Sequence, residues 1–128
     1  MDRFFAIVGA LLGLTGVGVG AFGAHALKQH FADHSDLQAA YQTATSYHLY
    51  HALALLGAAW AAERWGGPWI AWSGCLFIFG IVVFSGSLYM LSISNVRGWG
   101  AVTPIGGVAL MAGWLSLAIG VWRGTAGK

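Results

Sequence analysis

Charged residues are scarce in this chain: they make up 8% of its 128 residues, while 58% are hydrophobic. A soluble domain carries about 25% charged residues, so the chain lacks the side chains that a water-exposed surface needs. The six basic and four acidic residues leave four uncharged runs, at 4–27, 37–62, 65–96 and 98–122. Each run exceeds the roughly 20 apolar residues that cross a bilayer. The composition therefore excludes a soluble enzyme, a nucleic-acid-binding domain and a disordered tail, and it predicts a membrane protein.

Cysteine and proline are also scarce. The single cysteine, Cys75, excludes an intrachain disulfide and a metal cluster built from cysteines. The two prolines, Pro68 and Pro104, stand where apolar runs begin, and proline suits the first turn of a helix. Because no low-complexity stretch or linker divides the chain, we expect one domain over residues 1–128.

The runs and their flanking residues predict an all-α membrane protein that forms a bundle of four transmembrane helices. The predicted helices cover about residues 4–26, 36–62, 68–92 and 104–122. The segment Ser35-Asp36-Leu37-Gln38 matches a capping box, with Ser35 as the N-cap of the second helix.

Small residues recur in the first and fourth predicted helices at spacings of three and four. In the first helix they are Gly9, Gly13, Gly16, Gly20 and Gly23. In the fourth helix they are Gly106, Ala109, Gly113, Ser116 and Gly120. Small side chains let the backbones of transmembrane helices approach closely, so these glycine-rich seams predict a tightly packed bundle.

Basic residues near the helix ends predict the orientation, because cytoplasmic loops carry an excess of Lys and Arg. With four crossings, the N-terminus, the second loop and the C-terminus share one side of the membrane. That side holds Arg3, Arg64, Arg123 and Lys128, and the other side holds Lys28 and Arg97. The distribution favours an orientation with both termini in the cytoplasm.

All five histidines lie between positions 25 and 51. His25 ends the first predicted helix, and His48 and His51 share a face of the second, so we expect His25 and His51 to approach each other. Imidazole is a ligand for zinc, copper, iron and nickel, and two such rings can also bind haem. A metal or haem site, a proton or quinone-type site, and a purely structural role all fit this pattern. The second to fourth helices have no carboxylate within the membrane, which argues against a strongly coupled ion transporter.

Four strings resemble one known family in order and spacing. They are Gly20-Ala21-Phe22-Gly23-Ala24-His25, Tyr50-His51-Ala52-Leu53-Ala54, Phe84-Ser85-Gly86-Ser87-Leu88-Tyr89 and Thr103-Pro104-Ile105-Gly106-Gly107. The family is Domain of Unknown Function 423, small membrane proteins of bacteria and mitochondria. The resemblance implies a multi-pass protein of the cell (inner) membrane with four helices and no assigned activity. It marks as candidate site residues His25, His51, Ser85, Ser87, Tyr89, Thr103 and Pro104.

By the predicted topology, the four strings fall at one membrane face. A polar cluster of His25, His51, Ser87, Tyr89 and Thr103 is expected there, where it would bind a headgroup, a small ligand or a partner, or lock the bundle. Ser85-Gly86-Ser87 lacks the strand-to-helix turn of a hydrolase nucleophile, so no enzyme is predicted.

Three functions fit these features. The first is a non-enzymatic accessory subunit or binding module that contacts the lipid bilayer and either a membrane-protein partner or a second copy, with no assigned cofactor and no nucleic acid. The second is a small oligomeric transporter or channel-like protein for a proton or small solute. The third is a redox accessory that holds haem or metal through His25, His48 or His51.

Overall fold

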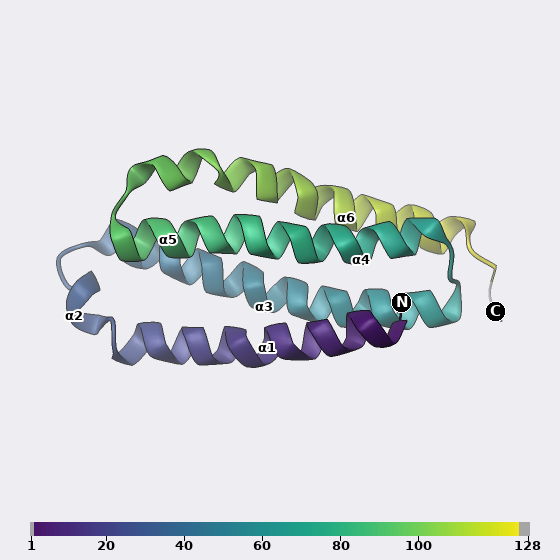
Figure 1. Ribbon diagram of the computed structural model, residues 1–128, viewed down its shortest axis with the longest axis horizontal. Coiled ribbons are helices and arrows are strands. Elements are labelled where there is room, and N and C mark those ends of the chain that lie inside the picture. The colour runs from purple at the N-terminus through teal and green to yellow at the C-terminus, as the bar shows by residue number, and fades with distance from the viewer. Residues whose placement is uncertain (1, 126–128) are drawn as a thin grey trace.

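The computed structural model describes residues 2–125, and every regular element in that range is helical (Figure 1). The elements are α1 (Asp2–His25), α2 (Lys28–Phe31), α3 (Ser35–Arg64), α4 (Pro68–Gly80), η1 (Ile81–Ser85), α5 (Gly86–Ser94), η2 (Arg97–Ala101) and α6 (Thr103–Arg123). The π-helical turn η1 joins α4 to α5 without a break, so the three form one long rod. The long helices begin and end within two residues of the ranges expected from the sequence.

Three helical stretches of the described chain are long and apolar enough to cross a membrane: Asp2–His25, Pro68–Ser94 and Arg97–Arg123. The fourth long helix, α3, has 30 residues but carries more polar side chains. It packs against α1 on one side and against α4, η1 and α5 on another, while α6 packs against α4 and η1. The more polar helix therefore lies between α1 and the rod formed by α4, η1 and α5 (Figure 1).

Glycines mark the closest approaches between helices. A Cβ built at Gly16 of α1 would lie 2.6 Å from Cδ2 of Leu49 in α3, and one built at Gly113 of α6 would lie 2.8 Å from the Phe77 ring in α4. Gly13 of α1, in contrast, has no such neighbour within 4 Å. In α1 the buried glycines are Gly9, Gly16 and Gly23, and in α6 they are Gly106, Gly113 and Gly120. Close approach therefore recurs every seven residues along both helices.

The start of α3 differs from the predicted capping box. The N-cap position is His34, and no side chain caps the helix. The carbonyl of His34 already accepts the bond from the Gln38 amide, which is the role of an N-cap residue, so Ser35 lies inside the helix. Of the basic residues used to orient the chain, Lys128 lies outside the described residues.

Candidate functional site

His48 and His51 lie near the middle of α3 and are buried, with 6% and 5% of their surface exposed. The helix begins at Ser35, so a rise of 1.5 Å per residue puts His48 about 20 Å along its axis. The histidines were expected at the end of the bundle that carries the first loop. The structure corrects this expectation, because α3 starts a full three turns before His48.

His51 makes one hydrogen bond through each ring nitrogen. Its Nε2 lies 3.0 Å from the indole nitrogen of Trp114 in α6, and its Nδ1 lies 2.8 Å from the carbonyl oxygen of Tyr47. An indole N–H can only donate and a carbonyl can only accept. Nε2 therefore accepts a hydrogen bond and Nδ1 carries the proton, which makes His51 a neutral imidazole held in one tautomer.

His48 has the opposite tautomer and connects three helices. The hydroxyl of Thr15 in α1 donates to the Leu12 carbonyl at 3.1 Å, so it accepts from Nε2 of His48 at 3.2 Å. Nδ1 of His48 then accepts from the Tyr89 hydroxyl of α5 at 2.9 Å. A directed chain of hydrogen bonds thus runs from Tyr89 through His48 and Thr15 to the Leu12 carbonyl.

The remaining candidate hydroxyls form separate contacts. Ser85 of η1 donates to the carbonyl of Ala44 in α3 at 2.7 Å and so ties the π-helical turn to that helix. Ser87 and Thr103 share a hydrogen bond of 2.6 Å between their hydroxyl oxygens, which joins α5 to the start of α6. The structure therefore brings together Ser87 with Thr103 and Tyr89 with His48, but it forms no single cluster from them.

His25 does not join either histidine of α3, and its predicted approach to His51 is wrong. The two helices are antiparallel: a Cβ at Gly23 would contact Tyr41, and one at Gly16 would contact Leu49 and His48. This register leaves His25 exposed at the end of α1, several turns from His51. In residues 2–125 no three His, Cys, Asp or Glu side chains lie together as a metal site would require, so the three-histidine site suggested by the sequence does not form.

Two partners of the histidines escaped the sequence analysis. Thr15 is the only hydroxyl-bearing residue of α1, and an isolated polar residue in a long apolar helix was a signal that could have been used. Trp114 gave no such signal, because tryptophan is common in membrane helices for its apolar surface alone.

A polar cleft of about 360 Å³ lies between α1 and α3 at the end of the bundle nearest the first loop. Its wall on α1 includes Gly20 and Gly23, and α3 contributes Gln38, Gln42 and Ser46. Gln38 and Gln42 are exposed and Ser46 is half-buried. They follow one another at intervals of four residues, so they line one face of the helix.

Residues 19–107 match the family model described as protein of unknown function, DUF423. The chain belongs to the DUF423 family. The resemblance inferred from the four sequence strings is thereby confirmed, and the match includes His48, His51 and the α1–α3 cleft.

Relatives of this DUF423 protein match it nearly end to end. It is 42% identical to UPF0382 membrane protein SSP2132 of Staphylococcus saprophyticus, over 94% of this chain and 98% of the relative. It is 41% identical to UPF0382 inner membrane protein YgdD of Escherichia coli K12, over 95% and 92% of the two chains. For UPF0382 membrane protein YwdK of Bacillus subtilis the values are 42%, 91% and 94%. No solved structure matches the chain.

Proposed function

We propose that this DUF423 protein crosses the membrane four times and acts as a non-enzymatic binding module. Helix α3 is the fourth crossing: it lies among the three apolar helices, and its buried histidines are fully hydrogen-bonded. Such bonds remove the cost of several kcal/mol that unsatisfied polar groups carry in hydrocarbon. Both termini are on the cytoplasmic side, where Arg3, Arg64 and Arg123 lie.

The observation that carries the binding role is the α1–α3 cleft itself, on whose wall Gln38, Gln42 and Ser46 present one polar face. Small-molecule sites occupy about 300–1,000 Å³ and combine a few convergent polar groups with apolar walls, and the cleft fits both criteria. Its lining residues carry amides and hydroxyls but no formal charge. The ligand class that fits is therefore an uncharged polar group with both donors and acceptors, such as a sugar or glycerol moiety.

The two histidines support binding less well than the cleft, because both ring nitrogens of each are already used. Coordination of haem or a metal ion would break one of these bonds. A proton-conducting role is the second candidate, and the chain from Tyr89 through His48 to Thr15 favours it. That chain ends at the backbone carbonyl of Leu12, which cannot pass a proton onward, so binding ranks first.

The binding proposal predicts that Gln42→Leu loses a bound molecule. The protein is purified from its native membrane in mild detergent and examined by native mass spectrometry, with Gln29→Leu on α2 as the control outside the cleft. We expect the wild type and the Gln29→Leu control to retain a bound molecule that carries no charge. Gln42→Leu is expected to lose this molecule. An identical adduct pattern in all three proteins, or no adduct on any of them, would contradict the proposal.

Proton flux into liposomes that contain the purified protein separates the second candidate from the first. A flux that His48→Phe abolishes and Gln42→Leu leaves unchanged favours proton conduction. The absence of flux above that of empty liposomes excludes it.

The orientation is tested by cysteine labelling in a Cys75→Ser background. Ser35→Cys, at the first-loop end of α3, is expected to react with an impermeant maleimide in intact spheroplasts. Thr125→Cys, after the end of α6, is expected to react only after lysis. The reverse pattern would place both termini outside the cytoplasm.

A further inference from the structure

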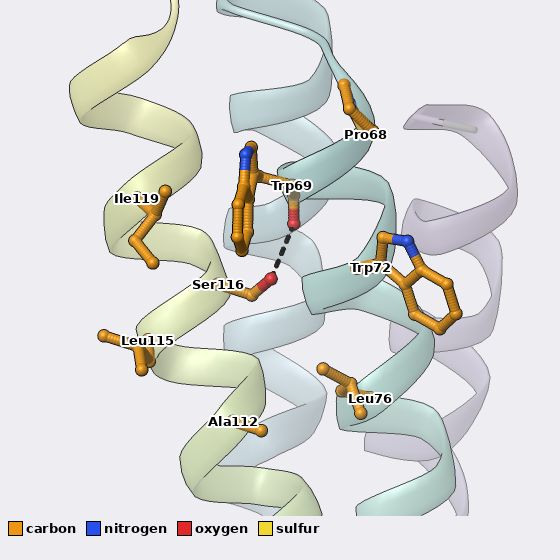
Figure 2. Close-up of a pocket in the computed structure, with 8 residues that line it drawn as sticks. All are labelled: Pro68, Trp69, Trp72, Leu76, Ala112, Leu115, Ser116 and Ile119. Carbon is orange, nitrogen blue, oxygen red and sulfur yellow. Dashed lines mark hydrogen bonds between the residues drawn. The ribbon is translucent and has the colours of Figure 1, made fainter.

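An open groove of about 600 Å³ runs along the contact between α4 and α6 at the end of the bundle nearest the termini (Figure 2). Its walls are Pro68, Trp69, Trp72 and Leu76 on one side and Ala112, Leu115, Ser116 and Ile119 on the other. Figure 2 shows the Trp69 indole between the two helices. The hydroxyl of Ser116 donates to the Trp69 carbonyl at 3.1 Å. Apart from the two indole nitrogens, this hydroxyl is the one side-chain polar group among the lining residues, so the groove is apolar.

A second, more polar pocket of about 260 Å³ continues this groove toward the end of the bundle. The two cavities share Pro68 and Trp69, and the outer pocket is also lined by Arg123 and by the loop that contains Gly66 and Gly67. A second cation lies beside it, because the guanidinium carbon of Arg64 is 6.0 Å from the centre of the Trp65 ring. The cavity therefore changes from apolar to cationic along its length.

The dimensions of the groove match one leaflet of a bilayer. From Pro68 to Leu76 the α4 wall rises about 12 Å at 1.5 Å per residue, and half of the hydrocarbon core measures about 15 Å. Tryptophans such as Trp65 and Trp69 typically lie at the membrane interface, where Arg123 would face the headgroups. The apolar part thus runs from the interface toward the bilayer centre.

The side chains on the groove walls favour a lipid chain over a partner helix. Helices associate in membranes through small residues, and the glycines of α4 and α6 that meet close neighbours face inward: Gly80 lies against Leu110, and Gly113 against Phe77. Two small residues, Ala112 and Ser116, also line the groove, but Ser116 is buried, and the large hydrophobic side chains most exposed along the groove are the bulky Trp72 and Leu115. A thin, flexible chain fits between such walls, whereas a helix about 10 Å wide would rest on top of them.

We propose that the two cavities form one binding site for an anionic phospholipid. Arg123 binds the phosphate through charge-assisted hydrogen bonds, Arg64 adds attraction at the rim, and one acyl chain lies in the groove between α4 and α6. This site is at the opposite end of the bundle from the α1–α3 cleft and does not depend on the function proposed for that cleft.

Lipid retention measured by native mass spectrometry tests the site. Purified protein is mixed with equal amounts of dioleoylphosphatidylglycerol and dioleoylphosphatidylcholine. We expect the wild type to retain the anionic lipid about fivefold better, the gain that one cation near an anionic surface provides. Arg123→Gln should remove this preference, while Arg97→Gln, at the other end of the bundle, should keep it.

A second pair of variants tests the apolar part. Ala112→Trp fills the groove and should lower the retention of both lipids, whereas Val108→Trp, at an exposed position of α6 outside the groove, should not. Should Ala112→Trp fail to fold, Leu115→Ser tests the same wall by making it polar. Equal retention of both lipids by the wild type, or equal losses in a variant and its control, would overturn the proposal. Free glycerol phosphate that binds as tightly as the anionic lipid would also overturn it, because the acyl chain in the groove would then contribute nothing.

Discussion

Two adjacent glycines at the start of α6 allow the packing of this helix to be tested by one pair of substitutions. A Cβ built at Gly106 would collide with the backbone nitrogen of Phe84 in η1 and lie 2.7 Å from its Cα. A Cβ at Gly107 would lie 3.6 Å from Cδ2 of the same residue, which is ordinary van der Waals contact. Gly106→Ala and Gly107→Ala therefore make the same chemical change in different steric surroundings.

The expected difference follows from the two terms that each substitution changes. Replacing glycine by alanine within a helix gains up to about 1 kcal/mol from the backbone, and this gain is common to both variants. Overpacking typically costs about 1–3 kcal/mol and applies only at Gly106. Because the obstacle there is backbone, no side-chain rotation relieves it. We expect Gly106→Ala to be less stable than Gly107→Ala by about 1–3 kcal/mol.

The assay is unfolding in mixed micelles with increasing sodium dodecyl sulfate, followed by far-ultraviolet circular dichroism. The two free energies of unfolding are compared with each other, so errors common to the method cancel. If both variants unfold at the same detergent fraction, α6 does not pack against η1 at Gly106, and the close contact between Gly106 and the Phe84 backbone is wrong.

Two further predictions concern bonds between distant parts of the chain. Trp114→Phe leaves Nε2 of His51 without a donor and should lower the free energy of unfolding by about 1 kcal/mol. Trp122→Phe, at an exposed position, should not lower it. Equal free energies of unfolding for the two variants would contradict the bond between Trp114 and His51. The second bond joins the Asp36 carboxylate to the Arg97 guanidinium, with 2.6 Å between Oδ2 and Nη2. This hydrogen bond holds the pKa of Asp36 below its ordinary value of 3.8. The stability from this pair is therefore present above pH 3.8 and is lost as the pH falls through the lowered pKa, so acid titration should destabilise the wild type more than Asp36→Asn.

Much of the helical architecture could be predicted from the sequence because it depends on local properties. Three of the four charge-free runs correspond to helices of the described chain that are apolar enough to cross a membrane, while α3 is more polar than its run suggested. Pro68 does stand in the first turn of its helix, as expected. The prediction of the start of α3 from a local sequence pattern was wrong. The capping box predicted at Ser35 does not form: the N-cap position is His34, whose carbonyl accepts the first helical bond, and no side chain caps the helix.

The candidate sites depended on features that no local pattern encodes. The sequence placed His25 and His51 at one depth, but the α1–α3 register brings His48 to Thr15 and leaves His25 at the helix end. The π-helical turn at Ile81–Ser85 was also unforeseen. It adds a residue to one turn of the rod and so changes which later side chains face α3 and α6.

The sequence alone thus determined that the chain is helical, where the long helices begin and end to within two residues, and to which family it belongs. Only the tertiary structure decided how far each helix slides along its neighbours, which partners His48 and His51 bind, and where clefts remain. The physical reason is that hydropathy changes little when one apolar helix shifts along another. The shift is fixed instead by shape, where a glycine such as Gly16 meets a bulky side chain such as Leu49.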